Sequence, residues 1–342
     1  MIKDMDGNSI NLLENPNGHM LVLGQSGSGK TYFMCRKMEE SIKNKKSILV
    51  FDYSGSYTRK EFEKNKFCIG NTMMFVNPCE LPVKWEFRRE GIENVIADVL
   101  IRVLPVGSYY QKKLLREAVK RLFDIFGAFN MTQLLEVLEW MLNVKSEVNE
   151  QENIRHILTR LEPFSELSEF TIVAVNGDKQ VIKCKPIVVV QLSNYAELQK
   201  KFLLNFLVEL LWEEIKRGIN RADILIFDEF QHLNLKEGYA VSALLREGRK
   251  YGVSVYAASQ FIGKKEKEVE ETLMQAGNKI FFHPTESESR DVAYWIDAQR
   301  VTQWSRRLGS LDVGQVVVKG CYSIADKSRA CKKPIICNVR EV

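Results

Sequence analysis

The sequence predicts an α/β fold in which helices cover a mainly parallel β-sheet and a helical insertion interrupts that sheet. Three observations support this prediction. Short runs rich in β-branched residues alternate with amphipathic segments along most of the chain. One long stretch lacks such runs and instead carries apolar residues at helical spacing. A glycine-rich turn joins the first strong apolar run to a helical segment, which makes a strand–turn–helix unit.

The expected strands are apolar, β-branched runs bounded by polar or turn residues. Six of them form the sheet: 19–24, 47–52, 186–192, 223–227, 253–258 and 279–283. Two further short strands, 315–319 and 333–339, are expected around a turn that closes or extends the sheet edge. A long helix over 195–218 follows the third run, and Gly218 is its expected stop.

The stretch between the second and third runs has a helical pattern. Four helices are expected there: 92–104, 108–126, 132–142 and 153–161. Ser108 and Thr132 are their candidate N-caps, because a hydroxyl can accept a hydrogen bond from the first free backbone N–H groups. We therefore divide the chain into a first part of the core (1–88), a helical insertion (89–170) and the remainder of the core (171–342).

Composition excludes several classes of protein. With 342 residues, 45% hydrophobic, 27% charged and only 8 prolines, the chain is neither disordered nor a low-complexity scaffold. Its formal net charge of +5 permits contact with nucleic acid but does not require it. Seven cysteines without a CxxC pair indicate neither a disulfide framework nor a zinc knuckle. Without a signal-peptide pattern or a membrane-length apolar run, we expect a cytoplasmic protein.

The glycine-rich turn is a complete G-x-x-x-x-G-K-[ST] motif between an apolar strand and a helix. Its residues, with the one that follows, are Gly24, Gln25, Ser26, Gly27, Ser28, Gly29, Lys30, Thr31 and Tyr32. Such a loop brings backbone N–H groups together around a nucleotide phosphate at a helix N-terminus. Lys30 is expected to neutralise the β- and γ-phosphate oxygens of ATP, and Thr31 to offer its hydroxyl to Mg²⁺.

A second acidic motif indicates what happens to the nucleotide. The run 223–227 is followed by Asp228 and Glu229. We expect Asp228 to hold the Mg²⁺ shell and Glu229 to orient or deprotonate the attacking water, which is hydrolase chemistry. The alternative is that the two carboxylates only cap a helix N-terminus.

Two further features follow on the same scaffold. A helix over 238–251 places Arg246 and Arg249 three residues apart on one face, where both could point at a neighbouring molecule. The next strand ends at Gln260, which should emerge at the same sheet edge as the phosphate loop and could sense the γ-phosphate. The alternative for all three is an ordinary solvated surface.

At these residues the chain resembles the FtsK–HerA superfamily of P-loop motor ATPases, and most of all its HerA-type and conjugative-transfer members. The motifs that carry the resemblance are GHMLVLGQSGSGKT (18–31), DYSGSY (52–57), DEFQH (228–232), REGRKYG (246–252) and ASQ (258–260). The first is generic to P-loops, whereas the ordered combination is specific. The helical insertion and the long helix after it also resemble the layout of this superfamily.

The resemblance implies a RecA-like domain that assembles into a hexameric ring, with ATP at subunit boundaries and DNA in a central channel. It implies that an arginine reaches into the neighbour's site, and Arg249 fits that position best, with Arg246 second. The sequence also departs from the family. Only 23 residues precede Gly24, so we expect neither the N-terminal barrel of HerA proteins nor membrane helices, and Ser56 stands where many relatives have an acidic residue.

Candidate contacts to DNA are four basic clusters: Lys84/Arg88/Arg89, Lys112/Lys113/Arg116/Lys120/Arg121, Lys264/Lys265/Lys267 and Arg306/Arg307. The expected function is a hexameric, ATP-hydrolysing ring motor of HerA type that acts on DNA, double-stranded in this interpretation, with a separate effector such as a nuclease. The alternatives are an ATP-gated ring scaffold that recruits or activates a partner protein without processive translocation, and a secretion-type ATPase.

Overall fold

The computed structural model describes residues 2–13, 17–64, 72–78, 87–88, 91–167, 170–175, 186–218, 222–260, 266–324 and 330–339. The chain forms two compact units, which we describe separately. The sheet unit consists of Met1–Met74, Lys185–Val189 and Arg221–Val342. The helical unit consists of Phe75–Cys184 and Val190–Asn220. The three-part division expected from the sequence remains a prediction.

One large sheet has the strand order β14-β2-β1-β15-β13-β12-β3-β11-β10-β4-β9-β5. The pairs β12·β3, β3·β11, β11·β10 and β10·β4 are parallel. The strands from β12 to β5 in this order are β12 (Asn278–Phe281), β3 (Met20–Leu23), β11 (Ser254–Ser259), β10 (Ile224–Asp228), β4 (Ile48–Asp52), β9 (Ile187–Gln191) and β5 (Met73–Val76). Every residue of β3, β4 and β10 is buried, as expected for parallel strands covered on both faces. The expected α/β fold with a mainly parallel sheet is confirmed.

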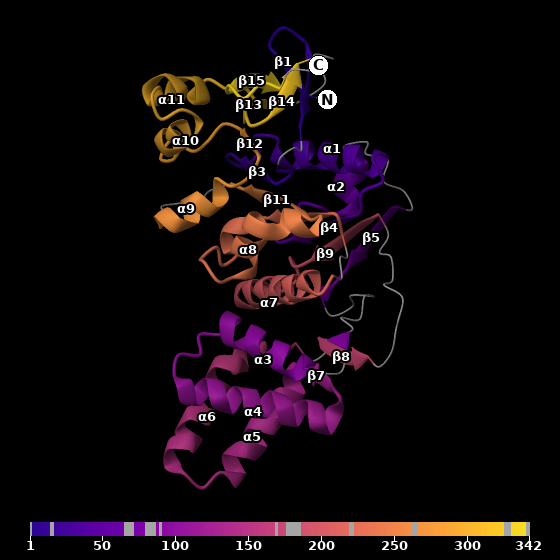
Figure 1. Cartoon of the computed structure of the whole chain (residues 1–342), viewed down its shortest axis with the longest axis vertical. Helices are drawn as coiled ribbons and strands as arrows, with labels where there is room; N and C mark the ends of the chain where they lie inside the picture. The colour runs from indigo at the N-terminus through magenta and orange to yellow at the C-terminus, as the bar shows by residue number, and fades with distance from the viewer. Residues whose placement is uncertain are drawn as a thin grey trace. The chain divides into compact units, whose positions relative to one another are not determined.

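Antiparallel strands from both ends of the chain extend the sheet beyond β12 (Figure 1). They are β13 (Gln315–Lys319), β15 (Ile335–Asn338), β1 (Ile2–Asp4), β2 (Ser9–Leu12) and β14 (Tyr322–Ile324). The sequence predicted β13 and β15 but not β1, β2 or β14. These three strands have three or four residues each, which is too short for a periodic pattern to be recognised.

The helices of the sheet unit follow its strands. They are α1 (Lys30–Lys43), α2 (Arg59–Lys64), α8 (Ala240–Glu247), α9 (Lys267–Leu273), α10 (Ser289–Ile296) and α11 (Val301–Gly309), with 3-10 turns η4 (Phe230–His232) and η5 (Gly248–Tyr251). The single helix expected over 238–251 is wrong, because α8 ends at Glu247 and η5 follows it. Gly252 then closes η5 with a φ of 74°, a conformation that glycine adopts without strain. Arg246 and Arg249 therefore lie on different elements.

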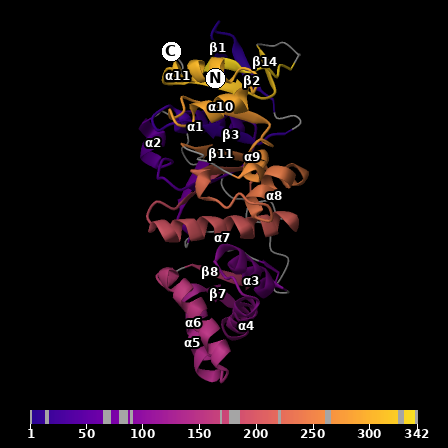
Figure 2. The same cartoon turned by 90° about the vertical axis from the view of Figure 1, so that its left-hand side faces the viewer.

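The helical unit has its own core. Its elements are β6 (Phe87–Arg88), α3 (Ile92–Val103), α4 (Tyr109–Phe126), β7 (Ala128–Asn130), α5 (Met131–Val144), α6 (Val148–Leu161), η3 (Glu162–Phe164), β8 (Thr171–Val175) and α7 (Glu197–Lys216). The small sheet has the order β6-β8-β7. Helix α7 runs unbroken in both views (Figure 1, Figure 2). The ring of Phe206 stacks on those of Phe129 and Phe202, with centroid distances of 5.6 and 5.4 Å.

Two helix starts in this unit test the expected N-caps. Ser108 caps α4, since its side chain accepts a hydrogen bond from the backbone N–H of Gln111. Thr132 does not cap α5. Asn130 does, because its carboxamide oxygen accepts from the backbone N–H groups of Thr132 and Gln133, so the helix begins one residue before Thr132. Asparagine and threonine are both good N-caps, and the sequence alone does not separate them.

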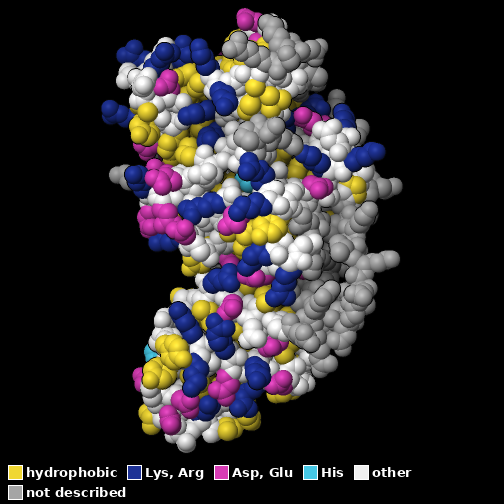
Figure 3. Space-filling model, in the orientation of Figure 1, with side chains coloured by type: hydrophobic (Ala, Val, Ile, Leu, Met, Phe, Trp, Pro, Cys, Tyr) yellow, Lys and Arg dark blue, Asp and Glu magenta, His cyan; other side chains and the backbone are white. Residues whose placement is uncertain are grey.

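Among the described residues, no helix is both long enough and apolar enough to cross a bilayer. The space-filling view shows Lys and Arg side chains interspersed with Asp and Glu over the visible face (Figure 3).

Candidate nucleotide site

The phosphate loop connects β3 to α1 by a backbone path that needs glycine. Gly24, Gly27 and Gly29 have φ values of 153°, 76° and 110°, which L-residues with a side chain rarely adopt. Gly24 also has no room for a side chain, because a Cβ atom there would lie 2.4 Å from Cβ of Phe282. Conformation therefore favours glycine at all three positions, and packing also requires it at Gly24.

The loop is held by neighbours that the sequence analysis did not single out. The backbone N–H of Gln25 donates to the carbonyl of His283 at 2.9 Å, and Gly24 donates to the carbonyl of Ser259 at 3.3 Å. On the other side, Gly314 donates to the carbonyl of Ser28 at 3.2 Å. Because Gly314 directly precedes β13, the antiparallel extension of the sheet supports the loop. These contacts depend on strand register, which no local motif encodes.

Lys30 lies at the centre of the expected site. Its Nζ donates to the carbonyl oxygens of Gly24 at 2.6 Å and Gln25 at 3.0 Å. Burial lowers its pKa, while the nearby carboxylates of Glu229 and Asp228 act in the opposite direction. The structure thus brings the lysine of the loop into the field of both acidic residues. Thr31 follows in the first turn of α1, and the hydroxyl of Tyr32 accepts from the guanidinium of Arg36 at 3.1 and 3.2 Å.

Asp228 ends β10 in an environment rich in negative charge. It is 8% exposed, and burial is the main reason that its pKa is raised to about 7, with Asp52 and Glu229 adding to the effect. Its carboxylate accepts a hydrogen bond from the hydroxyl of Ser54. Ser54 in turn lies 2.6 Å from the hydroxyl of Ser56, measured between the two Oγ atoms. Ser56 is therefore linked to Asp228 through Ser54.

Asp52 organises the loop after β4. Its carboxylate accepts from the backbone N–H groups of Gly55 and Ser56 at 2.9 Å each, and from that of Tyr57 at 3.1 Å. Despite these donors, burial raises the pKa of Asp52. Asp52 is fully occupied by the backbone, so it fixes the loop that carries Ser54.

Glu229 has an unusual backbone conformation, and both oxygens of its carboxylate accept hydrogen bonds. Its φ of 53° is in the left-handed region, which is uncommon for a non-glycine residue and recurs at functional sites. One carboxylate oxygen accepts from Nε2 of Gln260 at 2.5 Å, and the other accepts from Nε2 of Gln231 at 2.7 Å. The hydroxyl of Ser259 donates to the carboxamide oxygen of Gln231 at 2.5 Å, which fixes that amide.

The sequence placed Glu229 and Gln260 at one edge, and the structure brings them into contact. It also adds Gln231, which the sequence analysis missed. The signal was present in the DEFQH segment, because a polar residue two positions after the acidic pair can turn back toward it. Nothing in the spacing alone distinguishes such a residue from a solvated one.

The two arginines do not lie at this edge. Arg246 forms an ion pair with Glu237 at 2.7 Å and donates to the hydroxyl of Thr272 at 3.2 Å. Arg249 is exposed and its charge acts on His19, the residue before β3. Gly24 follows the opposite end of the same strand, which is about 13 Å long at ~3.3 Å per residue. Arg249 is therefore separated from the loop of its own chain by the length of β3.

The basic clusters expected to contact DNA have different outcomes. Lys84, Arg89, Lys264 and Lys265 lie outside the described residues, as does the side chain of Arg88. Lys267 forms an exposed ion pair with Glu271 at 3.7 Å. The guanidinium of Arg307 lies over the ring of Trp304, with 5.0 Å between its Cζ atom and the ring centroid. The cluster from Lys112 to Arg121 lies on α4.

The donor set at the nucleotide edge fits a hard divalent cation. Mg²⁺ prefers oxygen ligands, commonly one or two carboxylates completed by substrate phosphates and water. Asp228 supplies a buried carboxylate whose raised pKa a cation would relieve, and Thr31 supplies a hydroxyl beside Lys30. Among the described residues, no group of three or more His, Cys, Asp or Glu side chains forms a metal site by itself. The edge is therefore suited to a metal that arrives with a phosphate ligand.

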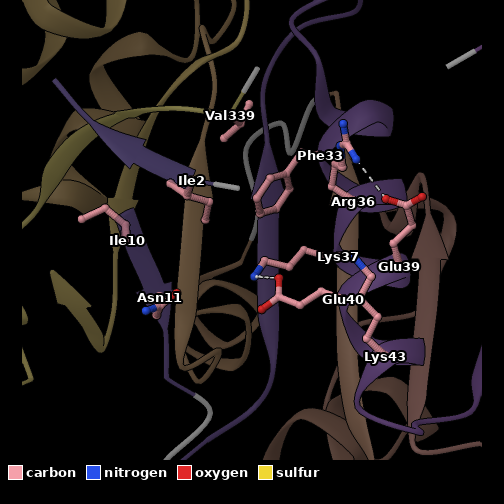
Figure 4. Close-up of a pocket in the computed structure, with 10 residues that line it drawn as sticks. All are labelled: Ile2, Ile10, Asn11, Phe33, Arg36, Lys37, Glu39, Glu40, Lys43 and Val339. Atoms are coloured by element: carbon pink, nitrogen blue, oxygen red, sulfur yellow. Dashed lines mark hydrogen bonds and ion pairs between the residues drawn. The ribbon is translucent and has the colours of Figure 1, made fainter. Parts of the chain in front are cut away.

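A second pocket, of about 320 Å³, lies between α1 and the antiparallel strands. Figure 4 shows the ring of Phe33 pointing from α1 toward Ile2, with Arg36–Glu39 and Lys37–Glu40 ion pairs along the helix. The charged side chains that line it are thus largely paired with one another. Phe33 also packs edge-on against Phe282, the residue beneath Gly24. Through Phe33 and Phe282, the pocket adjoins the residues that pack against the phosphate loop.

Comparison with known proteins identifies the family. The family described as the central domain of helicase HerA matches residues 9–211, which is more than half of the chain. The chain belongs to this family. It is similar to the DNA double-strand break repair helicase HerA of Sulfurisphaera tokodaii, with 25% identity over 318 residues, 88% of this chain and 62% of that protein. It is 23% identical to the HerA of Saccharolobus solfataricus, over 88% of this chain and 61% of that protein. The chain spans about three fifths of the length of these relatives.

Solved structures support the same fold. VirB4 of Thermoanaerobacter pseudethanolicus superimposes with a TM-score of 0.69 at 14% identity, over 100% of this chain and 96% of that chain. The bacterial conjugative coupling protein TrwB superimposes with a TM-score of 0.64 at 14% identity, over 94% and 86%. The family match confirms the resemblance to HerA-type ATPases, and the two superpositions confirm the RecA-like fold.

Proposed function

We propose that this HerA-family chain is an ATP-hydrolysing motor that works as a hexameric ring on double-stranded DNA, together with a separate effector such as a nuclease. The HerA relatives are named as DNA double-strand break repair helicases. A TrwB structure contains ADP and Mg²⁺. The observation that carries the proposal is the meeting of Lys30, Asp228, Glu229 and Gln260 at one edge of the sheet.

In this proposal the loop from Gly24 to Thr31 binds the phosphates of ATP. The glycine conformations let backbone N–H groups point at the phosphates, and the N-terminus of α1 adds its favourable dipole. Lys30 exchanges its contacts with the loop carbonyls for contacts with phosphate oxygens. Thr31 and Asp228 would hold Mg²⁺, which would neutralise charge on the phosphate oxygens.

Glu229 is the proposed general base. It takes a proton from the attacking water as the water oxygen bonds to the terminal phosphorus, and the bond from that phosphorus to the bridging oxygen breaks to release ADP. Gln231 and Gln260 hold the carboxylate through its two oxygens. Gln260 is in reach of both the glutamate and the phosphate loop, because Gly24 bonds to the residue before it. It is therefore the proposed γ-phosphate sensor.

Arg249 is the proposed arginine that acts on a neighbouring protomer. Its exposure and its position at the opposite end of β3 from its own phosphate loop support a role in another chain's site. Arg246 is the second choice, and within its own chain it contacts Glu237 and Thr272. An arginine supplied in this way stabilises negative charge on the transferred phosphoryl group and commonly contributes ~10³–10⁵ in rate.

Mixing two inactive variants tests this arrangement. Glu229→Gln and Arg249→Ala should each lose ATP turnover in the assembled ring. If the two residues serve one site from different protomers, a 1:1 mixed ring regains about one quarter of wild-type turnover, because about one boundary in four has both native residues. If both residues act within one chain, the mixture shows no recovery. If Arg249 has no role, Arg249→Ala alone keeps its turnover. Sedimentation or mass photometry of the mixture confirms that rings have formed.

A further inference from the structure

Helix α4 carries more net positive charge than the other described helices of the helical unit. Its 18 residues include five basic and two acidic side chains, a net charge of +3. Counted in the same way, α3 and α7 are −1 each, α5 is −2 and α6 is zero with neutral histidine. Figure 3 shows both positively and negatively charged side chains on the visible face. The feature that distinguishes α4 is therefore its net charge compared with that of the other helices.

One exposed tyrosine and three exposed basic residues of α4 form a line, which we call the α4 stripe: Tyr109, Lys113, Arg116 and Lys120. Spacings of four, three and four residues place these side chains on one face of a helix. The opposite side of α4 is the buried core face, with Leu115, Ala118 and Leu122 fully enclosed. The stripe is therefore the exposed face of a helix whose opposite face is packed in the core.

The charges of the stripe are not neutralised by strong pairing. Arg116 pairs with Asp98, but the side chains are 47% and 42% exposed, and ion pairs this exposed are weak. Among the described residues, Lys113 and Lys120 have no ion pair. The helix's acidic Glu117 is already engaged by Arg121 at 3.0 Å and by Lys145 at 3.3 Å. Arg121, which also lies over Trp140, therefore belongs to a different contact from the stripe.

Two exposed aromatic side chains stand at the start of the stripe. Tyr109 is 76% exposed and Tyr110 is 57% exposed, and their rings meet edge-on with centroids 6.0 Å apart. Large aromatic side chains bury apolar surface when they can, so two adjacent exposed tyrosines call for a reason. Tyrosine rings beside lysines are the combination on which unpaired bases stack while the backbone follows the positive charge.

We propose that the α4 stripe binds the phosphate backbone of DNA, and that Tyr109 and Tyr110 stack on unpaired bases next to it. The stripe extends about 16 Å from residue 109 to residue 120 at ~1.5 Å rise per residue, and duplex DNA carries one charge per ~1.7 Å of axis. It can therefore meet several phosphates at once. The proposal rests on DNA as the ligand of the proposed function, but it assigns a binding surface outside the nucleotide site.

Fluorescence anisotropy with labelled oligonucleotides tests the proposal on the full chain. The double variant Lys113→Ala/Lys120→Ala removes two backbone contacts. Its matched control is Lys64→Ala/Lys236→Ala, which removes the same charge from exposed lysines paired with Glu61 and Glu266. The stripe variant should bind DNA about tenfold more weakly, and the slope of log K against log salt should shrink by about 1.4 for single strands and about 1.8 for duplex. The control should bind like the wild type.

A second pair of measurements tests the aromatic part. Tyr109→Ala/Tyr110→Ala should weaken binding of a single strand by about tenfold, since stacking contributes ~1–3 kcal/mol per base, and should leave duplex binding nearly unchanged. Equal losses for both ligands would overturn the stacking. Thermal unfolding checks that these exposed substitutions leave the fold intact.

The outcomes separate this proposal from that of the nucleotide site. If the wild type binds DNA and the stripe variant has the same affinity and salt slope as the control, the stripe is not the DNA surface, whatever the ATPase does. If the wild type hydrolyses ATP but binds no DNA at any salt concentration, the stripe proposal is wrong and the proposed ATPase stands. If DNA binding follows the stripe while no hydrolysis occurs, the stripe stands and the motor is wrong.

Discussion

The two ends of the parallel strands in the sheet unit use the same kinds of residue in opposite ways. At the carboxyl ends lie Asp228 after β10 and the Glu229 that follows it. At the amino ends lie Asp223 before β10 and His19 before β3. Asp223 accepts hydrogen bonds from the backbone N–H and the hydroxyl of Ser47 at 2.7 and 2.8 Å. Asp223 thereby joins the start of β10 to the start of β4.

The carboxyl end, in contrast, accumulates features that cost stability. Asp228 is buried beside two other acids, and Glu229 adopts a left-handed backbone. Such costs persist where the surrounding structure compensates for them, and they cluster at sites that bind or react. At the amino end, His19 is buried and neutral, and its Nδ1 accepts from the backbone N–H of Val255 at 2.9 Å. We call the carboxyl end the strained edge and the amino end the relaxed edge. The comparison supports the proposal that the strained edge carries the chemistry, whereas the relaxed edge joins the strands.

The largest expected effect is the loss of turnover when the strained edge is changed. Glu229→Gln removes the proposed base and should lower kcat for ATP by ~10²–10⁴, with nucleotide affinity retained. Asp223→Asn, at the other end of the same strand, is the matched control and should stay within a few-fold of wild type. A steady-state ATPase assay with a fluorescent nucleotide titration measures both quantities.

Lys30→Ala completes this comparison because it should abolish nucleotide binding itself. If recruitment of a partner protein survives Glu229→Gln but not Lys30→Ala, the chain is an ATP-gated scaffold and the motor is wrong. Equal turnover for Glu229→Gln and Asp223→Asn would remove the distinction between the two strand ends.

The second expected effect concerns the relaxed end and acid. Burial lowers the pKa of His19 to about 4, and the charge of Arg249 adds to this. A neutral histidine in the folded state means that protonation favours unfolding, so stability is present above pH ~6.5 and is lost as the pH falls toward 4. The shift corresponds to about 3 kcal/mol at most, at ~1.36 kcal/mol per pKa unit.

Urea unfolding of wild type and His19→Asn, monitored from pH 7.5 to 4, measures this effect. Asparagine can accept the hydrogen bond from Val255 but does not titrate, so the wild type should lose its advantage over the variant as the pH falls. Other titrating groups cancel in the difference. Two curves that stay parallel over this range would show that His19 is not held neutral by the fold.

How much of this was predictable from sequence depends on the range of the interaction involved. The phosphate loop, Asp228 and Gln260 were placed at one edge because each follows an apolar run, and parallel strands align their carboxyl ends. That argument needs only local patterns and one rule of topology. It gave the α/β class and the elements that carry the site.

What the sequence did not predict depends on register and on competition between neighbours. The break of the expected helix at Gly248 and the cap at Asn130 instead of Thr132 are choices between locally similar options. The support of the loop by Phe282 and Gly314 depends on how the antiparallel strands add to the sheet. Local propensity does not contain this information, because residues far apart in the chain decide it.

The smallest expected effect probes Gln231, which only the structure revealed. Gln231→Ala removes one of the two amides that hold Glu229, and should lower kcat about tenfold, close to the ~1.4 kcal/mol expected for a hydrogen bond to a charged group. KM should change little, because Gln231 is not expected to touch the nucleotide. Ser259→Ala should show a weaker effect of the same kind, since the hydroxyl of Ser259 acts on Glu229 only through the amide of Gln231. If Gln231→Ala raised KM and left kcat unchanged, the residue would bind nucleotide and would not position the base, and the strained edge would then have one organising glutamine, Gln260, instead of two.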